Sequence, residues 1–112
     1  MIGPITLLEA TSAAGNLTSG WLDLGDFTGC SITCLISGSN IAGTLTLDCS
    51  NDMTTLVEVP SSSTAITSSA DHIYNVSDVQ YRYIRVAWAA SSGTGNLSVT
   101  GVIKQPYIPK QP

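Results

Sequence analysis

The stretch TLTLDCS, residues 44–50, decides the fold of this chain. Polar and apolar side chains alternate along it, and successive side chains of a β-strand point to opposite faces of a sheet. The side chains of Leu45, Leu47 and Cys49 are therefore expected to point into a core, and those between them towards solvent. A helix would need apolar residues three and four positions apart, and that spacing is almost absent from the sequence.

The same alternation recurs on both sides of this stretch, between turn signals rich in Gly, Asn, Asp and Ser. Strands at intervals of about 8–12 residues are typical of an antiparallel β-sandwich or a small barrel. We predict a single all-β domain with buried Ile32, Leu45, Leu47, Val86 and Leu97. The predicted strands cover 19–24, 30–37, 44–50, 55–59, 71–77, 80–89 and 97–104, with a short strand about Ile66 and turns at 38–40, 50–52 and 91–96.

The composition of the 112 residues excludes several classes of protein. Only 11% of the residues are charged and the net charge is −4, which argues against binding nucleic acid through its phosphates. No apolar run approaches the 18 or more residues of a transmembrane helix, so no membrane partner is expected. The N-terminal residues 1–6 lack the features of a secretory signal, which predicts synthesis in a cytoplasm.

The residues that could carry chemistry are few and scattered. Cys30 and Cys34 would lie about 13 Å apart along a strand, which is too far for one zinc ion, so we interpret them as small buried side chains. His72 follows Asp71 directly, and neighbours in a strand point to opposite faces, so no catalytic triad is indicated. The acidic residues do not follow the spacing of a calcium loop. We therefore expect no catalytic residues, no cofactor and no metal, and predict that the protein is not an enzyme.

The segment YRYIRVAW, residues 81–88, leaves two interpretations open. Tyr81, Tyr83 and Arg85 would share one strand face, and an aromatic pair with an arginine can stack on a sugar or a base. In the second interpretation, which we favour, one face of the strand belongs to the core and the arginine stems pack on the rings.

Three segments resemble small structural proteins of phages. They are DCSND at residues 48–52 followed by LVEVP at 56–60, the segment 73–86, and the hairpin-like segment 91–99. Relatives often carry Gly and Trp after the SND turn, where this chain has Met53 and Leu56. Over about residues 20–104 the chain is similar to capsid decoration (cement) proteins of tailed phages, above all to the staple proteins of epsilon-fifteen-type short-tailed phages.

The resemblance implies a jelly-roll-like sandwich. From the strand and turn signals we predict that its core covers about 17–104, and from the prolines that residues 105–112 form an extended tail. The resemblance also implies a virion protein on the outer capsid surface that clamps major capsid protein subunits and acts as a homodimer or a trimer. The alternative is a carbohydrate-binding module of a phage tail or fibre, with Trp21, Tyr81, Tyr83 or Trp88 as an exposed platform. A small esterase or lyase is disfavoured because no constellation of catalytic residues is present.

Both ends of the chain are candidate contacts with a partner. The tail contains three prolines, which cannot donate hydrogen bonds to a central strand, so Tyr107 and Ile108 are expected to anchor it on a neighbour. Ile2 and Ile5 make the N-terminal segment similarly apolar, and we expect the same role for them.

Overall fold

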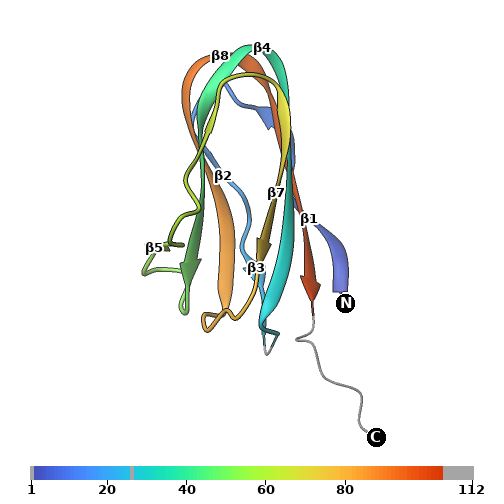
Figure 1. Ribbon diagram of the computed structural model, residues 1–112, viewed down its shortest axis with the longest axis vertical. Coiled ribbons are helices and arrows are strands. Elements are labelled where there is room, and N and C mark those ends of the chain that lie inside the picture. Colours follow the sequence, from blue (N-terminus) through green and yellow to red (C-terminus); the bar gives the residue numbers. More distant parts are fainter. Residues whose placement is uncertain (1, 26, 105–112) are drawn as a thin grey trace, which may run out of the picture.

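The computed structural model describes residues 2–25 and 27–104, and within them every regular element is a strand (Figure 1). All strand pairings are antiparallel, so the predicted all-β, antiparallel class is confirmed. The described part holds no helix that is long and apolar enough to span a membrane. The strands are β1 (Ile2–Ser12), β2 (Leu17–Thr18), β3 (Leu22–Asp23), β4 (Gly29–Ser50), β5 (Val57–Glu58), β6 (Thr64–Ile66), β7 (Ala70–Val76) and β8 (Tyr83–Lys104).

Strands β4 and β8 form one long ribbon that folds over on itself (Figure 1). Each has 22 residues, and they pair from Gly29 opposite Lys104 to Ser50 opposite Tyr83. One half of the ribbon lies in a first layer with the order β1–β8–β4–β7. The other half lies in a second layer, with β2 and β3 beside β8 and with β5 and β6 beside β4. The two layers are thus halves of a single continuous sheet.

The turns expected at 38–40 and 91–96 are the places where this ribbon bends. Both strands continue through the bend, and each carries one extra residue there, so the register is the same before and after it. One extra residue reverses which side chains face inwards. The buried positions accordingly change from even to odd numbers along β4 and along β8, and apolar side chains face the interior in both layers.

The core lies between the two layers and contains all five side chains predicted for it. Ile32, Leu45, Leu47, Val86 and Leu97 are each at most 1% exposed. On one side of the molecule the layers are joined by the backbone N–H of Gly20, which donates to the carbonyl of Leu7 at 2.8 Å. On the other side, between β7 and the pair β5 and β6, the hydroxyl of Tyr74 donates to the carbonyl of Ser62 at 2.8 Å. We call this second side the open seam.

The predicted core begins at about residue 17, but the sheet begins earlier in the chain, with β1. Its backbone pairs with β8 from Ile2 opposite Ile103 to Ser12 opposite Asn96. The N-terminal segment is therefore an edge strand of the protein's own sheet rather than a free arm. The alternation of polar and apolar residues does not reveal β1, because three register shifts interrupt its pairing with β8.

Candidate functional site

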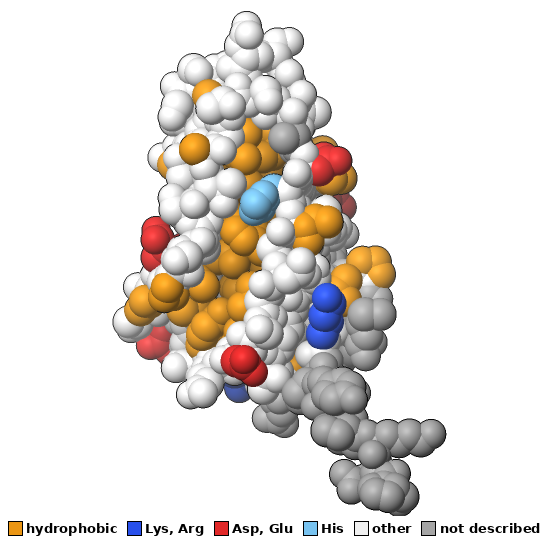
Figure 2. Space-filling view, in the orientation of Figure 1, with side chains coloured by type: hydrophobic (Ala, Val, Ile, Leu, Met, Phe, Trp, Pro, Cys, Tyr) orange, Lys and Arg blue, Asp and Glu red, His pale blue; other side chains and the backbone are white. Residues whose placement is uncertain are grey.

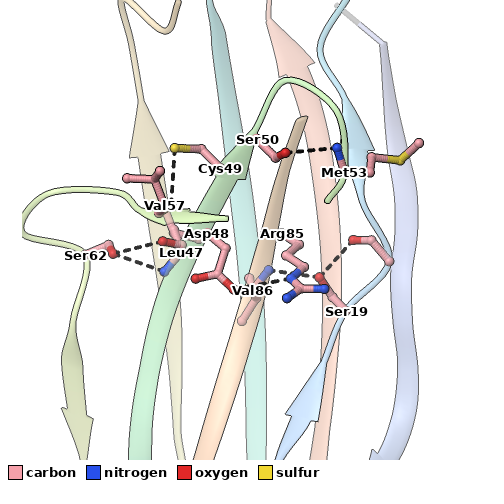
Figure 3. A network of polar contacts seen from close by, with 11 residues as sticks. Ser19, Leu47, Asp48, Cys49, Ser50, Met53, Val57, Ser62, Arg85 and Val86 are labelled. Atoms are coloured by element: carbon pink, nitrogen blue, oxygen red, sulfur yellow. Dashed lines mark hydrogen bonds and ion pairs between the residues drawn. The ribbon is translucent and has the colours of Figure 1, made fainter. Parts of the chain in front are cut away.

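The turn that follows β4 is held by a dense set of hydrogen bonds. The carboxylate of Asp52 accepts the backbone N–H groups of Thr54 and Thr55 at 2.8 and 2.7 Å. These bonds hold the pKa of Asp52 at about 2. The hydroxyl oxygen of Ser50 accepts the backbone N–H of Asp52. It also accepts the backbone N–H of Met53 (Figure 3). Because side chains replace the missing backbone partners, this turn is fixed in one conformation.

This fixed turn presents large apolar side chains to water. Met53, at a positive φ of 62°, is 50% exposed, and Leu56 and Val57 are 46% and 59% exposed. The loop is tied to the segment just before β8 by Asn51, whose side-chain oxygen accepts the backbone N–H of Arg82 at 3.0 Å. We call residues 50–57 the tip loop. It carries three of the five large hydrophobic side chains that are exposed in the described part of the chain.

A cleft of about 340 Å³ lies beside the tip loop, lined by residues that include Cys49, Asp52, Val57 and Tyr81. The thiol of Cys49 donates to the carbonyl of Val57 at 3.3 Å (Figure 3). Burial raises the pKa of Cys49, and raises that of Tyr81 to about 12. Both groups therefore keep their protons near neutral pH.

The outer face of the second layer carries the two arginines with two aromatic rings. Trp21 and Tyr83 lie 6.3 Å apart with ring planes inclined at 64°. The guanidinium of Arg85 lies over the Trp21 ring at 4.6 Å and pairs with Asp48 at 3.2 Å. Arg82 lies 5.2 Å from the centre of the Tyr83 ring. Because one face of Trp21 is covered and the rings are not coplanar, these side chains do not form a flat platform.

The segment 81–88 follows the second of its two interpretations. Ile84, Val86 and Trp88 face the core, and Trp88 donates its indole N–H to the carbonyl of Ala13 at 2.9 Å. Tyr81 packs against the core from the side of the cleft. The rings of this segment are thus used mainly for packing.

Of the four predicted contact residues, the structure describes only Ile2 and Ile5, and both belong to β1 rather than to the tip loop. Ile5 lies in β1 and packs partly against the core, and Ile2 pairs through its backbone with β8. Tyr107 and Ile108 lie outside the described residues. The sequence does not indicate the tip loop as a site, because residues 50–52 predict a turn and residues 55–59 predict a short strand. The signal that could have found it is the set of aliphatic side chains directly after the turn former Asp52.

The side chains that could bind a metal remain apart in the described part of the chain. No group of three or more His, Cys, Asp or Glu side chains gathers there. Cys30 and Cys34 are buried on the inner face of β4, as predicted for small core residues. His72 lies in β7, within the strand predicted at 71–77, and is half-buried beside the open seam with its ring 4.5 Å from that of Tyr74.

No protein-family model matches this chain, and no curated protein matches its sequence. Among solved structures it is similar to the SPBc2 prophage-derived protein YomS, with a TM-score of 0.57 and 13% sequence identity. The match covers 89% of this chain and 92% of that one. At this identity the likeness shows a shared all-β fold, and the neighbour is a protein of phage origin.

Proposed function

We propose that this protein is a structural virion protein that binds the outside of a phage capsid and reinforces the contacts between major capsid protein subunits. The observation that carries the proposal is the tip loop. A loop held in one conformation loses little conformational entropy when it binds, and its three exposed aliphatic side chains gain free energy when a partner covers them. Such a loop is suited to insertion into an apolar pocket of a protein partner.

Two further observations support this role. The protein shares its fold with a prophage-derived protein, and its low charge suits close packing on a large protein surface. A capsid presents many identical sites, so modest binding at each site is sufficient when adjacent subunits are bridged. Ile2, Ile5, Tyr107 and Ile108 remain proposed additional contacts in this arrangement.

The aromatic side chains favour this role over carbohydrate binding. Trp88 is 2% exposed, and Trp21 is covered on one face by Arg85. Carbohydrate binding needs a ring that is exposed flat to the sugar. Saturable binding to glycans without binding to capsids would favour the alternative.

The experiment titrates purified protein onto capsids assembled without it. Leu56→Ser changes a tip-loop residue that is 46% exposed, and Leu35→Ser changes a residue that is 47% exposed on a different face. We expect Leu56→Ser to weaken binding by about tenfold, which corresponds to about 1.4 kcal/mol, and Leu35→Ser to change it by less than about twofold. Equal binding by both variants, or no saturable binding of the wild type, would contradict the proposal.

A further inference from the structure

Strand β7 presents a long and regular free edge. Among the described strands it pairs with β4 alone, through seven consecutive residue pairs without a bulge. The opposite edge of the same layer, β1, contains Pro4 and three register shifts, which are features that prevent further strand pairing. The edge strands of the second layer have only two or three residues each. Strand β7 is therefore the one long, unprotected edge among the described strands.

The surface around this edge is apolar. Figure 2 shows hydrophobic side chains in a stripe along this side of the molecule, next to the single histidine. Ile73, on the outer face of β7, is 54% exposed, and Leu35 on β4 is 47% exposed. The register places them diagonally next to each other, because Ile73 lies opposite Thr33 and Leu35 lies opposite Asp71. A strand added to β7 would cover Ile73 and part of the stripe.

We propose that β7 pairs antiparallel with β7 of a second copy, about a two-fold axis at Ile73. In this register Asp71 faces Asn75 of the second copy, and His72 faces Tyr74 of the second copy. The two Ile73 side chains meet on the axis. Like charges are not brought together, because Asp71 faces an uncharged amide, and the His72–Tyr74 pair joins two rings. The strand is thus complementary to itself, which a two-fold interface requires.

The same arrangement explains why pairing stops at two copies. Among the described strands each copy has one long open edge and uses it in the dimer, and the outermost strands of the first layer are then the two protected β1 strands. The closed dimer has a continuous layer of eight strands and does not extend into a fibre. Seven paired residues span only about 24 Å, so the interface is small and we expect the dimer to dissociate on dilution.

The test uses sedimentation of the free protein over a range of concentrations. Ile73→Lys places two ammonium groups on the axis, and we expect it to raise the dimer dissociation constant at least about tenfold. Leu35→Lys is the control, because it makes the same change in charge on a similarly exposed side chain. Its two copies would lie about 20 Å apart, three strand spacings across the sheet and about four residues along it, beyond the screening length of about 8 Å at physiological salt. Circular dichroism shows that each variant is folded.

A second measurement tests the register. In a Cys49→Ser background, Ile73→Cys should form a disulfide-linked dimer under mild oxidation, because residues on the axis come within the distance that a disulfide spans. Leu35→Cys should not. The proposal is overturned if the wild type stays monomeric at the highest soluble concentration, if both lysine variants dissociate alike, or if both cysteine variants cross-link alike. Since no capsid is present, these results are independent of the test of capsid binding.

Discussion

At the scale of single residues, the three cysteines differ in their access to water although one alternating pattern predicts all of them to point inwards. Cys30 and Cys34 are 1% and 0% exposed on the inner face of β4. Cys49 lies at the end of the same strand, where the second layer gives way to the cleft, and it is only partly buried. Alternation gives the direction of a side chain, but its burial also depends on whether another element covers that end of the strand.

The first prediction concerns the reactivity of these thiols. Burial raises the pKa of Cys30 to about 11 and that of Cys34 to about 12, so both stay protonated at pH 8. Since the thiolate is the reactive species, labelling under native conditions should modify Cys49 first and leave the other two unmodified. All three should react in denaturant. Mass spectrometry after timed labelling checks this, and rapid native labelling of Cys34 would contradict it.

The second prediction concerns Leu47, which is 1% exposed between the layers. Leu47→Ala should lower the free energy of unfolding by about 2–5 kcal/mol, because it removes buried methyl groups and leaves a cavity. Leu35→Ala, on the half-exposed outer face, should cost clearly less. Urea denaturation of both variants measures the difference. A loss below about 0.5 kcal/mol for Leu47→Ala would be incompatible with this position in the core.

The third prediction concerns Asp52 and acid. Its pKa of about 2 lies below the ordinary value of about 3.9, so its stabilising effect is complete above about pH 4 and is lost as the pH falls towards 2. Asp52→Asn keeps the oxygen that accepts the N–H groups of Thr54 and Thr55 but cannot titrate. The melting temperature of this variant should therefore fall less between pH 5 and pH 2 than that of the wild type. Parallel curves for the two proteins would show that the carboxylate does not stabilise the turn.

At the scale of elements, the bend in the β4–β8 ribbon depends on glycine. Gly93 has a φ of 85°, and a Cβ added there would collide with the carbonyl of Asn40. Gly38 has a φ of 146°, and a Cβ there would collide with the carbonyl of Thr94. Each glycine therefore lets the two backbones approach closely where both strands change direction.

The fourth prediction tests this role of glycine. Gly93→Ala should lower the free energy of unfolding by about 1–3 kcal/mol, because alanine is strained at a positive φ and its Cβ needs space that the opposite strand occupies. Gly15→Ala is the control, because a Cβ there meets nothing within 4 Å. Chemical denaturation should show little change for the control. Equal stability of the two variants would mean that the bend tolerates a side chain.

The same elements show how far sequence reasoning reaches. Alternation predicts the inward positions of β4 and β8 and the turn signals predict where the ribbon bends, because both depend on neighbours in sequence. Neither signal predicts that β4 and β8 stay paired through the bend. This pairing depends on contacts between residues far apart in the sequence, such as Gly38 and Gly95. The tip loop is missed for a similar reason: only the folded sheet shows that Leu56 and Val57 have nothing to cover them.

At the scale of the whole molecule, the two layers leave different surfaces for different partners. The tip loop lies at one end of the folded ribbon, after the second-layer half of β4. The free edge of β7 lies in the first layer, beside the open seam. A second copy on β7 and a capsid on the tip loop would therefore occupy separate surfaces. A dimer would also present two tip loops, which strengthens attachment to a repeating surface without new contacts.

The last prediction concerns residues 105–112, which lie outside the described part of the chain. All strands and core side chains of the described part lie at or before Lys104, so we expect deletion of residues 105–112 to leave the unfolding midpoint unchanged. As an extended proline-containing segment they could reach about 25 Å, far enough to contact a neighbouring subunit through Tyr107 and Ile108. Deletion should therefore weaken binding to capsids, and Tyr107→Ser with Ile108→Ser in the full chain should have a similar effect. Undiminished binding by the truncated protein would remove the tail from the interface and leave the tip loop as its proposed centre.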